Sequence, residues 1–405
     1  MGKMFSYYTM NCRRFFMLNI KKQIRTLYIA QVLGNLSITG AWVAILAFRG
    51  FSLVQIGIAE TIFHITSLIF EIPSGALADI FGRKRTLIIS NVMSTIGCVI
   101  MAFTNGFAGV CISFVFLALS YNFASGSGDA LAYDSLKSVH MEDKYEGYSS
   151  NQTIIYRIGT GISTLCAGVA LAIGYRPAYI ISVINHLITI AVLLRLKEVR
   201  CVADEALPTL NAAAAGDNHA ENVADETSQP LGIKTATVRK VSEYFTESFR
   251  FMGKNVKATL LMFANSFVGA VDILLLFFLQ SKLMEAGISN RGLGVALFVI
   301  EMGGIIGARL ILKAKKARYY AVFTVCTLGV LCGVILEHSG IALIMTAGGF
   351  ISAIADDALQ VRTDARLQDM FPSWQRATLI SIGSFTFSVI MIIMSPLAGY
   401  FFSLW

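Results

Sequence analysis

Four side chains that can exchange protons or form hydrogen bonds recur within one apolar stretch of this 405-residue chain. They are Glu60, His64, Ser67 and Glu71, and their spacing of four, three and four residues places them on one face of a helix. Ionisable groups at membrane depth are costly and are functional candidates by default. We therefore predict that this face lines a polar cavity, with Glu71 or Glu60 as a proton or cation site. The alternative is that Glu60 lies exposed at the outer interface and His64 is only a packed polar side chain.

A second candidate is an acid followed by a base in the next apolar stretch. Asp129 is predicted to lie deep enough in its span to need a partner, and Arg157 is the natural one. An arginine stays protonated in proteins, so such a pair would keep Asp129 ionised. The pair could take part in transport or could only hold two helices together, and the sequence leaves both roles open.

Four further polar residues in apolar stretches are candidates for the same cavity. Asn35 lies in the first stretch, and Asp272, Glu301 and Asp357 lie in the second half of the chain. Asp357 has the alternative of pairing with one of the arginines that follow it on the same helix. Polar faces of this kind line a cavity for a small solute or hold helices together.

The elements that must position these residues are membrane helices. Hydrophobic residues make up 55% of the chain and charged residues 14%, whereas a soluble domain carries about 25% charged residues. A helix crosses a bilayer with about 20 apolar residues, and eleven segments meet that requirement. The predicted spans are Leu27 to Phe48, Leu53 to Leu77, Thr86 to Phe103, Phe107 to Leu136, Thr153 to Ile173, Ala178 to Leu194, Ala258 to Leu279, Leu293 to Leu312, Tyr319 to Leu336, Ile341 to Leu359 and Ala377 to Phe402.

The basic residues predict the orientation of these spans. With a cytoplasmic N-terminus, most of the 33 Lys and Arg residues fall on cytoplasmic segments, which is the positive-inside pattern. Only Arg49, Arg176, Lys282 and Arg291 fall outside, and Arg157 falls within a span. We expect a multi-pass protein of the cell (inner) membrane. The net charge of +8 then reflects topology and not a nucleic-acid partner.

A short basic sequence joins the second and third predicted spans. It reads G-x-x-x-D-x-x-G-R-K-R, with Gly75, Asp79, Gly82, Arg83, Lys84 and Arg85 at its defined positions. We predict a tight, Gly-rich turn here. The sequence resembles the loop between helices 2 and 3 of the major facilitator superfamily of secondary transporters, and the chain is closest in pattern to bacterial drug-efflux members. The alternative is a basic turn that obeys only the topology rule.

The resemblance implies an all-α membrane fold of two pseudo-symmetric six-helix halves. It also implies that the basic sequence is a conformational gate, in which the Asp and the basic residues brace the cytoplasmic side between the halves. The chain departs from drug/proton antiporters in two places, because residues 120–123 contain no Arg and the fifth span contains no Pro. Proton antiport is therefore predicted from the membrane acids and the general resemblance, and not from signature motifs.

Composition divides the chain into three parts. Residues 1–200 form the predicted N-terminal six-helix half, 201–256 a polar cytoplasmic linker with an amphipathic helix, and 257–405 the C-terminal half. Asp129-Ala130-Leu131 recurs as Asp357-Ala358-Leu359, which supports an internal repeat. The C-terminal half shows five spans, and we expect that the twelfth helix of the superfamily is missing.

Several classes of function have no support in the sequence. It contains no phosphate-binding Gly loop, no dinucleotide fingerprint and no HExxH motif. Its seven cysteines form no C-x-x-C pair, so neither a disulfide framework nor a metal site is expected. We expect no cofactor, no metal and no enzymatic activity.

These observations predict a secondary active transporter that exports a small amphipathic or cationic compound, by proton antiport and alternating access. Its expected partners are that substrate, protons and the lipid bilayer, and we expect a monomer. One alternative is a metabolite importer of the same fold. A second is a membrane scaffold or sensor that transports nothing.

Overall fold

A computed structural model describes residues 19–199, 250, 253, 255–314, 316–370 and 376–404. Within these residues every regular element is a helix, and ten helical segments are long and apolar enough to cross a membrane, which confirms the predicted all-α membrane fold. The first helices are α2 (Ile20–Asn35), α3 (Trp42–Phe48), α4 (Leu53–Phe81), α5 (Arg83–Phe103), α6 (Phe107–Ala124), α7 (Ser127–Lys137), η2 (Glu142–Lys144), α8 (Tyr145–Leu165), α9 (Ala167–Ile173) and α10 (Tyr175–Leu193). The remaining helices are α13 (Val256–Glu285), α14 (Asn290–Lys313), α15 (Tyr319–Glu337), α16 (Ala342–Met370) and α17 (Arg376–Ser403).

Three spans predicted as continuous helices are interrupted. Residues 36–41 separate α2 from α3, and Cys166 separates α8 from α9. Ser125 and Gly126 separate α6 from α7, and Gly126 has φ of +68°, a left-handed conformation that glycine adopts without a Cβ clash. Neither α2, with 16 residues, nor α3, with 7, reaches the length of a span by itself. The predicted total of eleven spans is therefore not confirmed.

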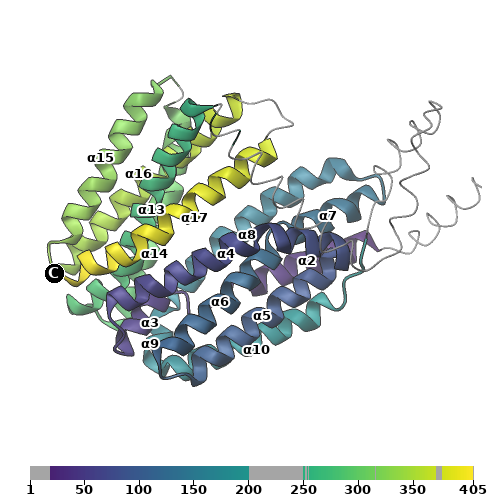
Figure 1. The fold of residues 1–405 in the computed structure, drawn as a ribbon, viewed down its shortest axis with the longest axis horizontal. Coiled ribbons are helices and arrows are strands. Elements are labelled where there is room, and N and C mark those ends of the chain that lie inside the picture. The colour runs from purple at the N-terminus through teal and green to yellow at the C-terminus, as the bar shows by residue number, and fades with distance from the viewer. Residues whose placement is uncertain are drawn as a thin grey trace, which may run out of the picture.

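The helices form two groups that meet along α4 and α17. Figure 1 shows α2 to α10 in purple to teal on one side and α13 to α17 in green to yellow on the other. Helices α4 and α17 contact each other extensively across this boundary. The ribbons of the two groups converge at the end that carries α3, α9 and the C-terminus, and they diverge toward α7 (Figure 1). We call the converging end the closed end.

Glycines allow the two groups to touch backbone to backbone at the closed end. A Cβ on Gly57 of α4 would collide with the Ser395 carbonyl of α17, and a Cβ on Gly399 of α17 would collide with the Leu53 carbonyl of α4. Such close approach of small residues is how membrane helices pack without a hydrophobic driving force. The seam between α4 and α17 therefore depends on a reciprocal pair of glycines.

A second reciprocal pair closes the other side of the same end. Gly168 of α9 lies against the Asn290 carbonyl at the start of α14. In return, a Cβ on Gly294 of α14 would lie 2.5 Å from the Leu165 carbonyl of α8. The largest buried apolar cluster also spans both groups and includes Ile45, Leu297 and Phe402. The closed end is thus a continuous, tightly packed interface.

The predicted linker 201–256 and its amphipathic helix lie, apart from their last residues, outside the described part of the chain. The assignment of 1–200 and 257–405 as two halves stays a prediction, and the arrangement of the helices in Figure 1 agrees with it.

Candidate functional site

A cavity of about 1240 Å³ lies between the two groups of helices. Its walls come mainly from α4, α6 and α10 on one side and from α13, α16 and α17 on the other. The volume exceeds the several hundred Å³ typical of a small-molecule site. The cavity therefore has room for a solute together with water.

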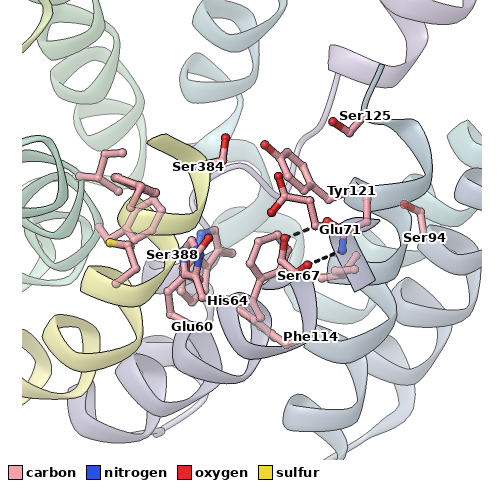
Figure 2. A pocket seen from close by; sticks show the side chains of 18 of the residues that line it. Glu60, His64, Ser67, Glu71, Ser94, Phe114, Tyr121, Ser125, Ser384 and Ser388 are labelled. Atoms are coloured by element: carbon pink, nitrogen blue, oxygen red, sulfur yellow. Dashed lines mark hydrogen bonds and ion pairs between the residues drawn. The ribbon is translucent and has the colours of Figure 1, made fainter. Parts of the chain in front are cut away.

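The predicted polar face of α4 lies in the cavity wall. Glu60, His64, Ser67 and Glu71 all line the cavity, because the helical period directs them to the same side of α4. Figure 2 shows these four side chains along the helix, with Ser384 and Ser388 of α17 on the facing wall. The sequence interpretation of their placement agrees with the geometry, whereas their roles remain predictions.

Glu60 and His64 form a close pair on α4. His64 Nε2 lies 3.3 Å from Glu60 Oε1, and both residues are buried, each 8% exposed. The His64 ring lies edge-on to Phe63 and to Phe387 of α17, with ring centroids 5.5 and 5.8 Å apart. His64 Nδ1 has no hydrogen-bond partner within the described residues. The pair therefore presents a carboxyl group and an imidazole to the cavity, next to the seam between the helix groups.

Ser67 joins α4 to α6 through two hydrogen bonds. Its hydroxyl donates to Asn122 Oδ1 at 2.8 Å, and Asn122 Nδ2 donates to the Ser67 carbonyl at 2.7 Å. Both bonds are drawn in Figure 2. This pairing sets the rotation of α4 against α6. It thereby directs Glu71, one turn further along α4, into the cavity.

Glu71 lies beside the ring of Tyr121 from α6 (Figure 2). The side chain is half-buried, and no ion pair with it occurs within the described residues. A carboxyl in this setting can receive either a proton or an organic cation. Tyr121, 62% exposed, was not singled out from the sequence, because an isolated Tyr in an apolar span carries no distinguishing signal.

Aromatic rings cover much of the remaining wall. Trp42 of α3 packs edge-on against Phe114 of α6 and Phe277 of α13, with ring centroids 5.1 and 5.2 Å apart. Trp42 therefore bridges the two helix groups. The lining also includes Phe63, Tyr179 and Phe387.

Charge in the described lining is of one sign. Glu60, Glu71 and Asp364 supply carboxylates, and none of the described lining residues is Lys or Arg. Asp364 was not predicted, although it follows Gln360 by one turn on the cavity face of α16. Asp364 lies between Arg362 and Arg366, which the sequence interpretation treated as possible partners of Asp357, and it was therefore not considered. The cavity can therefore attract cations and stack aromatic groups.

Asn35 lies next to this cavity but is not among the described lining residues, whereas its neighbours Gly34 and Leu36 are. A Cβ on Gly159 of α8 would lie 2.6 Å from the Asn35 Cβ, so the side chain packs against α8. Its Nδ2 is buried without a hydrogen-bond partner in the described chain. Asn35 thus supports the helix packing behind the wall.

Asp129 lies in the first turn of α7, after a break in the predicted helix, and its side chain is exposed. The helix break at Gly126 is the reason, because it creates a new helix N-terminus whose free amide groups favour a carboxylate. The side chain of Arg157 lies outside what the structure describes, so the Asp129–Arg157 pair stays a prediction.

The turn in the basic sequence at 75–85 is confined to one residue, and most of the sequence is helical. Helix α4 continues through Phe81, and α5 begins at Arg83, so Gly82 alone forms the junction. Gly82 has φ of +97°, and a Cβ there would lie 2.6 Å from Glu198 Oε2. Residues 76–81 are apolar apart from Asp79 and contain no helix breaker, so the helix continues to Gly82, whose N–H donates to the Ala78 carbonyl at 3.0 Å.

Glu198, which the sequence did not indicate, receives the free amides at the start of α5. The Arg83 and Lys84 backbone N–H groups donate to its two carboxylate oxygens at 2.8 and 3.0 Å. An anion at a helix N-terminus is stabilised by these amides and by the helix dipole. Glu198 thereby ties the segment after α10 to the junction at Gly82.

The basic side chains of the motif make contacts within their own helix group. Arg83 forms an ion pair with Asp134 of α7 and donates to the Ala130 carbonyl at 2.8 Å. Lys84 Nζ donates to the Leu194 carbonyl at 2.9 Å, and Arg85 is exposed. The side chain of Asp79 lies outside the described part. The predicted gate between the halves is therefore untested.

Asp272, Glu301 and Asp357 lie behind the cavity wall, inside the second helix group. None of the three is among the described lining residues, although Ile273, next to Asp272, is. A Cβ on Gly304 of α14 would collide with Asp357 Oδ2, so Asp357 points at α14. The prediction that these acids line the cavity is thus not met by their positions.

Known proteins resemble this chain in both sequence and fold. A family model described as "Major Facilitator Superfamily" matches residues 27–355. The "Uncharacterized MFS-type transporter YxaM" of Bacillus subtilis (strain 168) is 22% identical over 351 residues, which cover 85% of this chain and 79% of the relative. An "Uncharacterized transporter" of Buchnera aphidicola subsp. Schizaphis graminum (strain Sg) is 36% identical over 89 residues, 22% of each protein.

Solved structures share the fold at low sequence identity. The nucleoside transporter NupG aligns with a TM-score of 0.67 and 13% identity, over 95% of this chain and 91% of that one. A D-xylose-proton symporter aligns with a TM-score of 0.65 and 12% identity, over 94% and 89%. Because the family model covers most of the chain, and because the helices and the cavity between their two groups agree with it, the chain belongs to the Major Facilitator Superfamily.

Proposed function

We propose that this protein is a secondary active transporter that exports a small amphipathic organic cation in exchange for protons. It works by alternating access in the cell (inner) membrane, with the Gly82 junction on the cytoplasmic side. It acts as a monomer, since one chain contains the whole cavity. The substrate leaves unchanged, so the protein is not an enzyme.

The chemistry of the cavity wall carries this proposal. Three carboxylates, two imidazoles and several aromatic rings line it, and no described lining residue is Lys or Arg. Organic cations bind to carboxylates and to the faces of aromatic rings. A solute with both a positive charge and an apolar body therefore fits better than an anion.

Exchange follows from competition for the same carboxylates. A carboxyl such as Glu71 can hold a proton or can pair with a substrate cation, but it cannot do both at once. Binding of one then promotes release of the other. Rocking of the two halves would expose this site alternately to the two sides of the membrane. The glycine seams at the closed end supply one of the two barriers.

Accumulation of ethidium, an aromatic cation, in cells tests the proposal. Cells that express the protein should accumulate less ethidium than cells with an empty vector, and a protonophore should abolish the difference. Glu60→Gln with Glu71→Gln should lose export, whereas Glu285→Gln, an acid on the exposed end of α13 paired with Lys282 at 2.7 Å, should retain it. If cells that express the protein well accumulate as much of each of several aromatic cations as cells with an empty vector, export of this class of compound is rejected.

A metabolite importer is the second candidate. Two solved structures that share the fold are named as a nucleoside transporter and a D-xylose-proton symporter. Serine and asparagine side chains in the wall, such as Ser182, Asn185 and Asn265, could hydrogen-bond to such polar solutes. Uptake of labelled nucleosides and D-xylose by the same cells separates the candidates, because an importer raises cellular label and an exporter of cations does not.

A further inference from the structure

A group of carboxyl side chains lies inside the C-terminal half, behind the cavity. Glu337 of α15 is 0% exposed and Asp356 of α16 is 6% exposed. Asp272 of α13 interacts electrostatically with both of them. The charges of Glu301 of α14 and Asp357 of α16 also act on Asp272. Four helices thus direct acids toward one buried region.

The packing around α16 makes room for these polar groups. Ser352, Asp356 and Gln360 follow one another at single turns on this helix. Glycines on the three surrounding helices leave space opposite α16. A Cβ on Gly333 of α15 would lie 3.3 Å from Ser352 Oγ, and one on Gly269 of α13 would lie 3.4 Å from Asp356 Oδ1. The Gly304–Asp357 contact described above completes the set on α14. The region is therefore a polar site enclosed by close helix packing.

Several oxygens in this site have nothing to bond to. Both carboxyl oxygens of Glu337, and Oδ1 of Asp356, are buried without a hydrogen-bond partner among the described residues. No described Lys or Arg forms an ion pair with Asp272, Glu337 or Asp356. An ionised carboxylate buried without a cation or hydrogen bonds is strongly disfavoured, and close like charges add to the cost. The arrangement therefore calls for bound positive charge.

Protons supply that charge better than a metal ion. No three of the described His, Cys, Asp or Glu side chains are arranged so that they could share one metal ion. A proton needs only one carboxyl oxygen, and it turns that oxygen into a hydrogen-bond donor. Among the described residues, the Cys326 thiol of α15 is a further titratable group at the site, and it interacts with Asp356.

We propose that Asp272, Glu337 and Asp356 form a proton-binding site of the C-terminal half, separate from the substrate cavity and connected to it through Gln360. Gln360 Nε2 donates to Asp356 Oδ2 at 3.3 Å, and Gln360 also lines the cavity. A proton that leaves Asp356 passes to cavity water and leaves a carboxylate behind. A role of this site in coupling rests on the proposed proton antiport. The binding of a proton at the site does not depend on that proposal.

Infrared spectroscopy of the purified full chain in detergent tests the site without any substrate. At neutral pH the wild type should show the C=O stretch of protonated carboxyls, and this band should shrink as the pH is raised and shift in D2O. Asp356→Asn and Glu337→Gln should each remove part of the band. Glu285→Gln, whose side chain is largely exposed and paired with Lys282, should leave the band unchanged.

A wild type without this band at neutral pH, or a band undiminished in both variants, would overturn the proposal. If one variant fails to fold, as judged by size-exclusion chromatography, the other variant and the wild-type titration decide. The measurement uses no ethidium, so its outcome is independent of the export assay. A normal band with no export would reject the proposed substrate class and leave the proton site in place.

Discussion

At the scale of single residues, Glu71 is the cavity acid whose surroundings are best defined. It lies one turn beyond the Ser67–Asn122 pair and beside Tyr121, so its position depends on α6 as well as on α4. Glu60 differs, because its Oε1 lies 3.3 Å from Nε2 of His64 and so has a close side-chain partner. The two acids of one helix face therefore have different electrostatic partners, and Glu71 is the more independent site for exchange.

Replacing Glu71 by Gln should abolish proton release more than it weakens substrate binding. The amide keeps the shape and can hydrogen-bond but cannot give up a proton, whereas aromatic contacts to an organic cation remain. The readout is the pH change on addition of ethidium to purified protein in weak buffer, together with the Kd. Ser384→Ala, a neutral change on the facing wall, should keep the release. Release of protons at the wild-type level by Glu71→Gln would remove this residue from the coupling mechanism.

At the scale of helices, two junctions depend on close contacts that only glycine permits. At the first, Gly82 separates α4 from α5, and the Glu198 carboxylate occupies the space where a side chain would lie. At the second, Gly57 and Gly399 let α4 and α17 meet at the closed end. The first junction is internal to one helix group, whereas the second joins the two groups and, in the proposed mechanism, opens and closes.

Glu198→Gln should lower thermal stability by weakening the start of α5. Removing a charge from an exposed helix N-terminus costs about 0.3–1 kcal/mol. The expected result is a small, reproducible decrease of Tm in detergent that becomes smaller at high salt, since screening already weakens the contact in the wild type. Glu142→Gln, an exposed acid in η2, serves as the matched control. An unchanged Tm for Glu198→Gln at low salt would mean that the carboxylate does not stabilise this helix end.

Gly57→Val should open the closed end. The added side chain collides with the backbone of Ser395, which cannot rotate away as a flexible side chain could. A cysteine introduced at Ser388 in the cavity wall should then react faster with an impermeant maleimide added from the closed side, and transport should fall. Gly147→Val in α8, where an added Cβ meets nothing within 4 Å, is the control. If Gly57→Val transports normally and leaves the cysteine as protected as before, this seam is not a barrier.

At the scale of the whole molecule, the two helix groups approach each other at one end and enclose the cavity between them (Figure 1). Trp42 bridges the groups near that end, and the Thr61 hydroxyl donates to the Ile392 carbonyl at 3.1 Å across the seam. Within the described residues, the helix groups therefore seal the cavity at this end. The distribution of the basic residues predicts which side of the membrane this end faces.

Cysteine labelling of intact cells tests the orientation. With native cysteines replaced, Asn105→Cys, between α5 and α6, should react with a membrane-impermeant maleimide added outside. His140→Cys, between α7 and η2, should react only after the cells are permeabilised. The physical reason is the positive-inside rule, which places the basic segments in the cytoplasm. The reverse pattern of labelling would show that the chain is inserted the other way round.

The sequence by itself determined the features that depend on one helix at a time. A run of about 20 apolar residues is long enough to cross the bilayer as a helix, so most span positions were predictable. The helical period likewise decides that Glu60, His64 and Glu71 share a face. Breaks inside spans were not predictable, because Gly126 is only one of several glycines near that point, and the sequence does not say which one adopts a positive φ.

Only the tertiary structure decided which distant residues meet. Glu198 contacts Arg83 across 115 positions of the chain, and Ser67 contacts Asn122 across 55. Glu337 is the last residue of α15, a position from which an exposed side chain would be predicted, yet in the folded protein it is completely buried. Asp129 is the opposite case, because its apolar neighbours in sequence suggested a continuous helix, whereas the structure places it, exposed, in the first turn of a new one. Burial and pairing depend on how helices pack against each other, and a linear pattern contains no record of that geometry.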